Sequence, residues 1–243
     1  GYVTYHEDSD KFSLSPEQAA VFARENEPTC IQGLMQGVVG QFVKEDVAID
    51  VFKTGRGRPW GEHHECCFCG TERFFRPAYA GHLLDEWIPA MSGVEEKLKM
   101  GAKVADIGCG LGTSSMLMAE QYPNSTIHAF DFHEPSIEEA KKRAEDKGLS
   151  NLEFFVSDAA AIPNESYDLA CIFDAWHDMG DPVGIAKSIR ETLADDGTFM
   201  VVEPMALDGL KNNIDNNPGA SMFYGFGTLI CCLLYTSDAA DEE

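Results

Sequence analysis

The sequence predicts an α/β fold in which a parallel sheet is covered by helices on both faces. From residue 101 to 231, short apolar segments alternate with amphipathic ones, the order that produces βαβ units. The glycine-rich stretch Asp106–Gly112 follows the first apolar segment and precedes a helical one. Strands are expected at 104–107, 126–130, 152–156, 167–173 and 198–202, and helices at 113–121, 135–147 and 182–193.

The first 58 residues have a different pattern. Tyr2–Tyr5 and Lys11–Leu14 are expected to pair as two strands around a polar turn. Ser15 and Pro16 then begin a helix, because Ser is a favoured N-cap and Pro suits the first helical position. A longer helix is expected over 31–52. A hairpin followed by helices is typical of the end of a winged-helix domain, which we expect in partial form at 1–58.

Residues 59–100 are expected to connect the two regions. Gly55–Pro59 has the composition of a linker, and Thr71–Ala90 has that of an aromatic-rich helix. Between them, His63–Cys69 contains two histidines and three cysteines, the one pattern in the sequence that suits a metal. A structural zinc site usually pairs two cysteine knuckles, and no second knuckle follows. We therefore expect an ordinary connecting loop and no metal.

The composition narrows the classes of partner. The chain has 41 acidic and 18 basic residues and a formal net charge of −23. Proteins that bind the phosphate backbone of nucleic acids usually present a basic surface. No nucleic-acid partner is therefore expected. The sequence has no apolar run of about 18 residues and no apolar leader, so we expect no membrane association and a cytoplasmic location with reduced cysteines.

Both ends of the chain are expected to be artificial. The sequence begins at Gly1 within a strand-like segment. Residues 232–243 resemble the translation of a sequencing adaptor, and we expect them to be a non-native tail.

Functional residues follow the predicted strands at positions that suit a bound nucleoside. Glycines at 108, 110 and 112 allow the backbone to pass close to a ligand. Asp131 ends the second strand, where a carboxylate can accept both ribose hydroxyls. Asp158 ends the third, where a carboxylate can accept from an adenine amino group. A dinucleotide fingerprint would need glycine at position 113, which is Thr113, so S-adenosylmethionine (SAM) is favoured over NAD.

The segment 60–230 resembles the bacterial-type small-molecule methyltransferases that join an N-terminal winged helix to a class I SAM domain. The resemblance rests on Gly70–Phe75, Val104–Gly112, Phe130–His133, Phe173–Pro182 and Val202–Pro204. It implies a Rossmann-like sheet at 101–231, SAM as cofactor, methyl transfer to a small molecule and a possible homodimer through the N-terminal domain. Class I domains end in an antiparallel hairpin, and this chain stops before it, so we expect a truncated domain.

The expected cofactor residues lie at or near the carboxyl ends of the strands. They are Asp106, Gly108, Cys109, Gly110, Gly112, Asp131, Phe132, Asp158, Ala159, Asp174 and Trp176. Cys109 is expected to fill the loop, since no base is evident beside it. Trp176 either lines the methionine end of the cofactor or fills a gap in the core. Glu203 either contacts substrate or faces water.

His177 is the candidate catalytic residue. Methyl transfer from a sulfonium depends on positioning the acceptor, and an acceptor that carries a proton also needs a base. Imidazole suits that role at neutral pH, although His177 could instead stabilise its loop.

Two other functions stay open. A non-catalytic SAM-binding or winged-helix regulator would need a basic recognition helix, whereas the helix over 16–26 carries Glu17, Arg24 and Glu25. An aminopropyltransferase-like enzyme would need several carboxylates for a polyamine, which the acidic composition allows.

Overall fold

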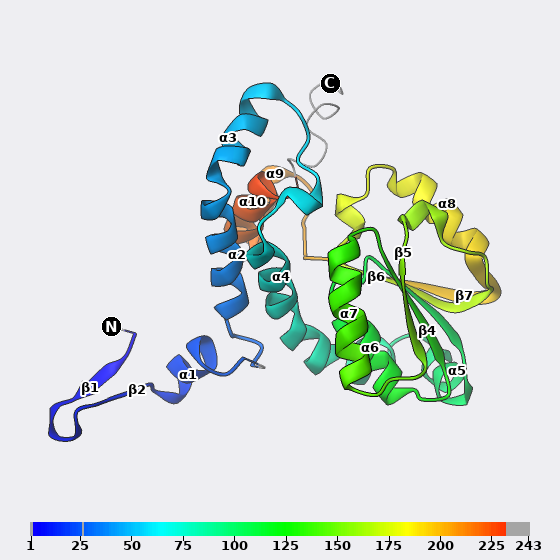
Figure 1. Ribbon diagram of the computed structural model, residues 1–243, viewed down its shortest axis with the longest axis horizontal. Coiled ribbons are helices and arrows are strands. Elements are labelled where there is room, and N and C mark those ends of the chain that lie inside the picture. The colour runs from blue at the N-terminus through cyan, green and yellow to red at the C-terminus, as the bar shows by residue number, and fades with distance from the viewer. Residues whose placement is uncertain (1, 26, 232–243) are drawn as a thin grey trace.

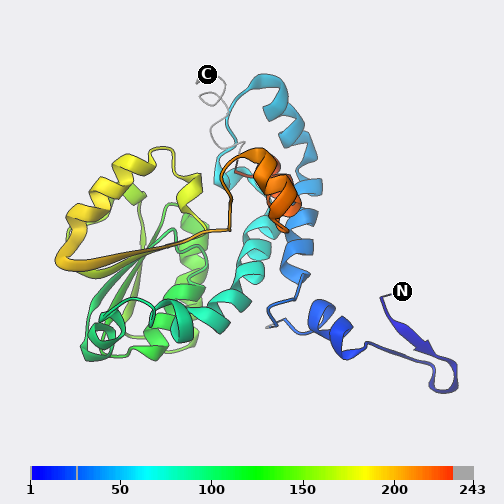
Figure 2. The ribbon, with the colours of Figure 1, turned by 180° about the vertical axis from the view of Figure 1, so that it is seen from behind.

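A sheet domain lies beside a column of helices in the computed structural model, which describes residues 2–25 and 27–231 (Figure 1). The reverse view, Figure 2, shows the same two parts, with the N-terminal hairpin projecting from the far end of the helical column. The expected adaptor-derived tail, residues 232–243, lies outside the described residues.

The sheet has five parallel strands in the order β5-β4-β3-β6-β7. They are β3 Lys103–Ile107, β4 Thr126–Asp131, β5 Leu152–Val156, β6 Tyr167–Phe173 and β7 Leu193–Val202. In β3, Val104, Ala105 and Ile107 are all buried, because helices on both faces of a parallel sheet shield its side chains from solvent. The predicted parallel sheet is confirmed, and β7 begins five residues earlier than expected.

Helices cover both faces of this sheet. Its helices are α5 Val94–Met100, α6 Thr113–Gln121, α7 Glu134–Asp146 and α8 Pro182–Thr192. Alternate strand residues separate two cores: Val104 and Leu169 pack with α5, α6 and α7, whereas Ala105 and Ile172 pack with α8. The carboxyl ends of all five strands therefore open at the same edge, where ligands bind in α/β sheets.

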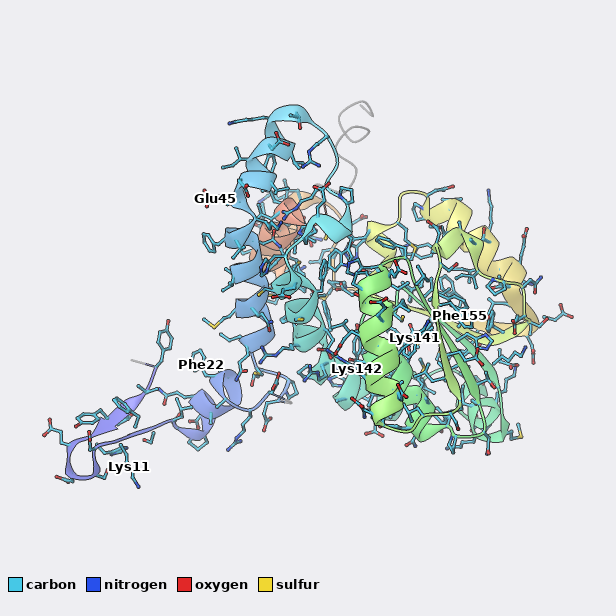
Figure 3. The ribbon with its side chains drawn as sticks, in the orientation of Figure 1. Lys11, Phe22, Glu45, Lys141, Lys142 and Phe155 are labelled. Carbon is cyan, nitrogen blue, oxygen red and sulfur yellow. The ribbon has the colours of Figure 1, made fainter. Side chains whose placement is uncertain are left out.

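The N-terminal hairpin and its following helix form where the sequence predicts them. β1 Thr4–His6 pairs antiparallel with β2 Lys11–Ser13. Helix α1, Pro16–Phe22, begins with a capping box in which Ser15 accepts from the backbone of Gln18. Figure 3 shows the hairpin, labelled at Lys11, standing clear of the sheet domain, labelled at Phe155.

The single helix expected over 31–52 is wrong, because two helices occupy this segment. They are α2 Gln32–Val43 and α3 Glu45–Thr54. Lys44 separates them with φ −112° and ψ 28°, outside the α-helical range. The periodic apolar residues continue through the break, so sequence periodicity alone did not reveal it.

The cysteine-rich segment expected as a loop is mostly helical. Helix α4, Glu65–Ala78, includes all three cysteines and continues as a π-helix over Tyr79–Trp87. His64 caps α4 by accepting from the backbone of Cys66 at 3.2 Å, which ties the histidine to a helix start. A helix is therefore confirmed in the segment 71–90, and it starts six residues earlier than expected.

The helices on either side of residue 58 pack directly together. Gly33 of α2 meets Gly70 of α4 so closely that a Cβ atom on Gly33 would lie 2.4 Å from the backbone nitrogen of Phe74. The expected linker has no regular structure, yet Arg58 is fully buried and donates to Gln41 at 3.3 Å. The assignment of 1–58 as a partial winged-helix domain stays a prediction.

Two short helices, α9 Leu210–Asn216 and α10 Ala220–Leu229, complete the helical column beside α2 and α4 (Figure 2). Within the described residues, no helix combines the length and apolar character that a membrane span requires.

Candidate cofactor and acceptor site

A cavity of about 900 Å³ lies at the carboxyl ends of the strands. One wall is the sheet edge with the glycine-rich loop, and the other consists of α2, α4 and α10. The second wall is mainly apolar and includes Leu34, Phe68, Phe75, Tyr79, Phe223 and Phe226. The volume of the cavity falls within the range typical of small-molecule sites.

The glycine-rich loop takes a shape that other residues would resist. Gly108, Gly110 and Gly112 have φ values of 75°, 53° and 75°, all in the left-handed region that favours glycine. Asp131 at the end of β4 fixes this loop, since its Oδ2 accepts from the backbone nitrogen of Gly110 at 2.8 Å. Its Oδ1 accepts from His133 at the same distance. An added Cβ on Gly110 would meet no atom within 4 Å, so the loop borders open space there.

Three of the predicted cofactor residues do not line the cavity. Asp106 is fully buried behind the loop, where its Oδ2 accepts from the hydroxyls of Ser114 at 2.7 Å and Ser115 at 2.6 Å. This burial raises the pKa of Asp106 to about 6. Gly112 packs against the ring of Phe154, and Trp176 packs on Phe199 with ring centroids 5.5 Å apart. Asp106 and Gly112 therefore shape the loop, and Trp176 packs against the core beside α8.

The other predicted cofactor residues all border the cavity. They are Gly108, Cys109, Gly110, Asp131, Phe132, Asp158, Ala159 and Asp174. Phe132 is 60% exposed, which leaves its ring available to a ligand. Asp158 accepts from the backbone of Ala160 at 2.8 Å and so closes a turn. Burial raises the pKa of the Cys109 thiol, which suits a loop filler and disfavours a nucleophile.

His177 lies at the cavity wall within a polar cluster. Its Nδ1 donates to Glu203 Oε2 at 2.5 Å, and Glu203 Oε1 accepts from the backbone nitrogens of Ala175 at 3.2 Å and Trp176 at 2.7 Å. Its Nε2 lies 3.4 Å from Cys231 Sγ. The Glu203 carboxylate therefore holds the turn after β6 and orients His177.

The charge state of His177 follows from these contacts. Hydrogen bonds to Cys231 and to Glu203 raise the pKa of His177 to about 11. Burial raises the pKa of the Cys231 thiol. These contacts favour the protonated form of His177 in the resting site, and its role as general base stays a prediction.

Asp174 is the second unusual titratable group beside the cavity. It follows β6 with φ 51°, an uncommon conformation that aspartate tolerates better than most residues. Burial raises the pKa of Asp174 to about 8, and one of its oxygens lies within 4.8 Å of ligand atoms of His177 and Glu203. A carboxyl that titrates near neutral pH is suited to proton transfer.

Sequence reasoning missed Glu72. This residue of α4 has a side chain only 9% exposed, and its Oε1 accepts from Thr113 at the start of α6 at 2.6 Å. Arg76 binds both of its oxygens, at 2.8 and 2.5 Å, and these contacts outweigh burial and lower the pKa of Glu72. Glu72 therefore joins the helical wall to the glycine-rich loop. Glu72 lies within Gly70–Phe75, one of the segments that carry the resemblance to methyltransferases, and this was the sequence signal for its importance.

Comparison with curated proteins gives partial matches to methyltransferases. The chain is 28% identical over 172 residues to sterol 24-C-methyltransferase of Aspergillus fumigatus, covering 69% of this chain and 42% of that protein. It is 33% identical over 105 residues to a ubiquinone biosynthesis O-methyltransferase of Actinobacillus pleuropneumoniae, covering 41% and 44%. In both matches the aligned region spans less than half the length of the relative.

Comparison with solved structures covers nearly the whole chain. Mitomycin 7-O-methyltransferase MmcR aligns with a TM-score of 0.66 at 17% identity, over 97% of this chain and 68% of its own. An O-methyltransferase family protein from Burkholderia thailandensis aligns with a TM-score of 0.68 at 13% identity, over 95% and 68%. Both confirm the Rossmann-like fold. The model of the methyltransferase domain family matches residues 98–234, more than half of the chain, and this protein therefore belongs to that family.

Proposed function

We propose that this protein transfers a methyl group from SAM to a small-molecule acceptor. The observation that carries the proposal is one cavity that joins a left-handed glycine loop, held by Asp131, to the His177–Glu203 pair. SAM supplies an activated methyl on its sulfonium, so the protein's part is mainly to align the two reactants.

The cofactor end of the cavity suits the nucleoside of SAM. A carboxylate offers about four acceptor positions, and Asp131 uses two of them for the backbone of Gly110 and His133. Acceptor positions therefore remain for the two ribose hydroxyls. Phe132 offers an exposed ring to the adenine, and the Asp158–Ala159 turn lies along the same wall.

The acceptor end suits an apolar molecule that carries one reactive oxygen or nitrogen. Aromatic side chains of α4 and α10 surround it, and the polar groups gather at one point around His177. The His177 imidazolium would stabilise an oxygen that loses its proton, as preorganised charge does in many active sites. Asp174, with a pKa of about 8, is the better proton acceptor of the two.

A homodimer is a further part of this proposal. Val39 and Phe42 of α2 are 52% and 72% exposed, and Phe52 of α3 is 59% exposed. Exposed apolar side chains of this kind on the helical column are typical of protein interfaces. A cytoplasmic location, expected from the sequence, stays a prediction.

The experiment is calorimetric titration with S-adenosylhomocysteine (SAH), the product of methyl transfer. Wild-type protein should bind one SAH per chain, and Asp131→Ala should lose about 2–3 kcal/mol, or tens to hundreds of fold in affinity. Asp146→Ala, an exposed aspartate at the end of α7, is the matched control and should bind normally. His177→Ala should keep its SAH affinity within a few fold, because it faces the acceptor. No SAH binding by folded wild-type protein would reject the proposal.

A further inference from the structure

We propose that His177, Asp178 and Cys231 form a binding site for one divalent metal ion of the zinc class at the edge of the cavity. Only residues 63–69 carry a metal pattern in the sequence, whereas the folded chain gathers these three elsewhere. His177 and Asp178 lie in the short 3-10 turn after β6, and Cys231 follows α10. The site stands on geometry alone and does not require the proposed methyl transfer.

The distances from His177 Nε2 to the other two ligand atoms match a tetrahedral zinc site. Zinc bonds of about 2.0–2.1 Å to nitrogen, 2.3 Å to sulfur and 2.0–2.2 Å to oxygen place tetrahedral ligands about 3.5 Å (nitrogen to sulfur) and 3.4 Å (nitrogen to oxygen) apart. In the structure His177 Nε2 lies 3.4 Å from Cys231 Sγ and 3.5 Å from Asp178 Oδ1. All three ligand atoms lie within 4.8 Å of one another. A metal could therefore enter with little movement of these side chains.

The surroundings of His177 are those of a metal-bound histidine. Metal ligation by one ring nitrogen is usually accompanied by donation from the other to a carboxylate, which fixes the ring. Here Nδ1 donates to Glu203 Oε2 at 2.5 Å, which directs Nε2 toward Cys231 and Asp178. Glu203 is itself held by two backbone N–H groups. The ring orientation is thus set before any ion arrives.

Charge and ligand type indicate which ion fits. Asp178 and Glu203 both contact the His177 ring, so acidic side chains border the position of the ion. Thiolate and imidazole select zinc-like ions, whereas magnesium and calcium prefer oxygen ligands alone. Binding would displace the thiol proton and any proton on Nε2 to solvent. Three protein ligands at a cavity wall leave the fourth position to water or to a ligand in the cavity.

The test uses chelator-treated full chain titrated with Co²⁺, followed by competition with Zn²⁺. Wild-type protein should bind one ion and show a thiolate-to-cobalt charge-transfer band. Cys231→Ser should lose this band and most of the zinc affinity. Cys69→Ser, a partly buried cysteine of α4, is the matched control and should keep both. Glu203→Gln should weaken zinc binding about 10–100-fold through His177.

Two results would overturn the proposal. One is a wild-type cobalt spectrum without a thiolate band, and the other is equal zinc affinity in wild type and Cys231→Ser. If thermal unfolding shows that Cys231→Ser is not folded, Asp178→Asn provides the same comparison. SAH titration of the chelator-treated protein separates the two ideas: SAH binding without zinc binding rejects only the metal site, and zinc binding without SAH binding rejects only the methyltransferase proposal.

Discussion

The exchange of Gly110 for alanine tests whether the cofactor lies against the glycine-rich loop. Gly110 has φ 53°, and an added Cβ would meet no protein atom within 4 Å. Gly148, after helix α7, offers a matched control, since it has φ 69° and the same open surroundings. Gly110 borders the main cavity, whereas Gly148 does not. The two substitutions therefore apply the same backbone strain at two different places.

The expected magnitudes follow from this match. Alanine in the left-handed conformation costs about 1–2 kcal/mol, and neither site adds a clash. Both variants should therefore lose a similar few degrees in Tm, since about 1 kcal/mol shifts Tm by roughly 2–4 °C in a chain of this size. Only Gly110→Ala places a methyl group in the space proposed for the cofactor. A loss of tenfold or more in SAH affinity, about 1.4 kcal/mol, is expected for it alone.

The assay is paired: thermal unfolding for stability and calorimetric SAH titration for affinity, on wild type and both variants. Equal SAH affinity in Gly110→Ala and Gly148→Ala, with equal loss of Tm, would refute the placement of the cofactor at this loop. An equal loss of SAH affinity in both would also refute it, because backbone strain alone would then explain the effect.

Two further predictions concern Asp174 and the exposed helical face. Burial raises the pKa of Asp174 to about 8. Between about pH 4 and pH 8 the folded protein therefore keeps a proton that the unfolded chain releases. Because of this difference, the free energy of unfolding falls as pH rises through this range. Asp174→Asn stays neutral, so its Tm advantage over wild type should grow from about pH 5 to about pH 8.5; a constant advantage would contradict this. Phe42→Asp should shift a dimer to monomer in sedimentation velocity, whereas Met100→Asp, an exposed apolar residue of α5, should not.

The sheet domain was predictable because two independent signals agree in each of its elements. The strands 152–156 and 167–173 and the helix 113–121 have the predicted bounds. Both strands are short apolar runs bounded by polar residues, and the helix begins directly after Gly112 and ends just before Pro123. At the break between α2 and α3, neither Lys44 nor its neighbours Val43 and Glu45 is a glycine or a proline, so no local signal in the sequence marks the break.

The direction of a carboxylate was harder to predict than its place. Asp106 is the penultimate residue of β3 and Asp131 is the last of β4. The Asp106 carboxylate accepts from the hydroxyls of Ser114 and Ser115, whereas that of Asp131 faces the loop and the cavity. The paired serines in the first turn of α6 were the available signal. The sequence contained no signal for the role of Cys231, because 54 residues separate it from His177 and only the fold brings the two together.

The polar centre of the site depends on the edge of the sheet. Glu203 follows β7, which pairs only with β6 among the described strands. It holds the turn after β6 through Ala175 and Trp176, and it orients His177. Any displacement of the β7 end would therefore move the imidazole, whether this ring faces a methyl acceptor or a metal ion. Because an edge strand is fixed on one side only, segments that cover β7 would act directly on the geometry of His177.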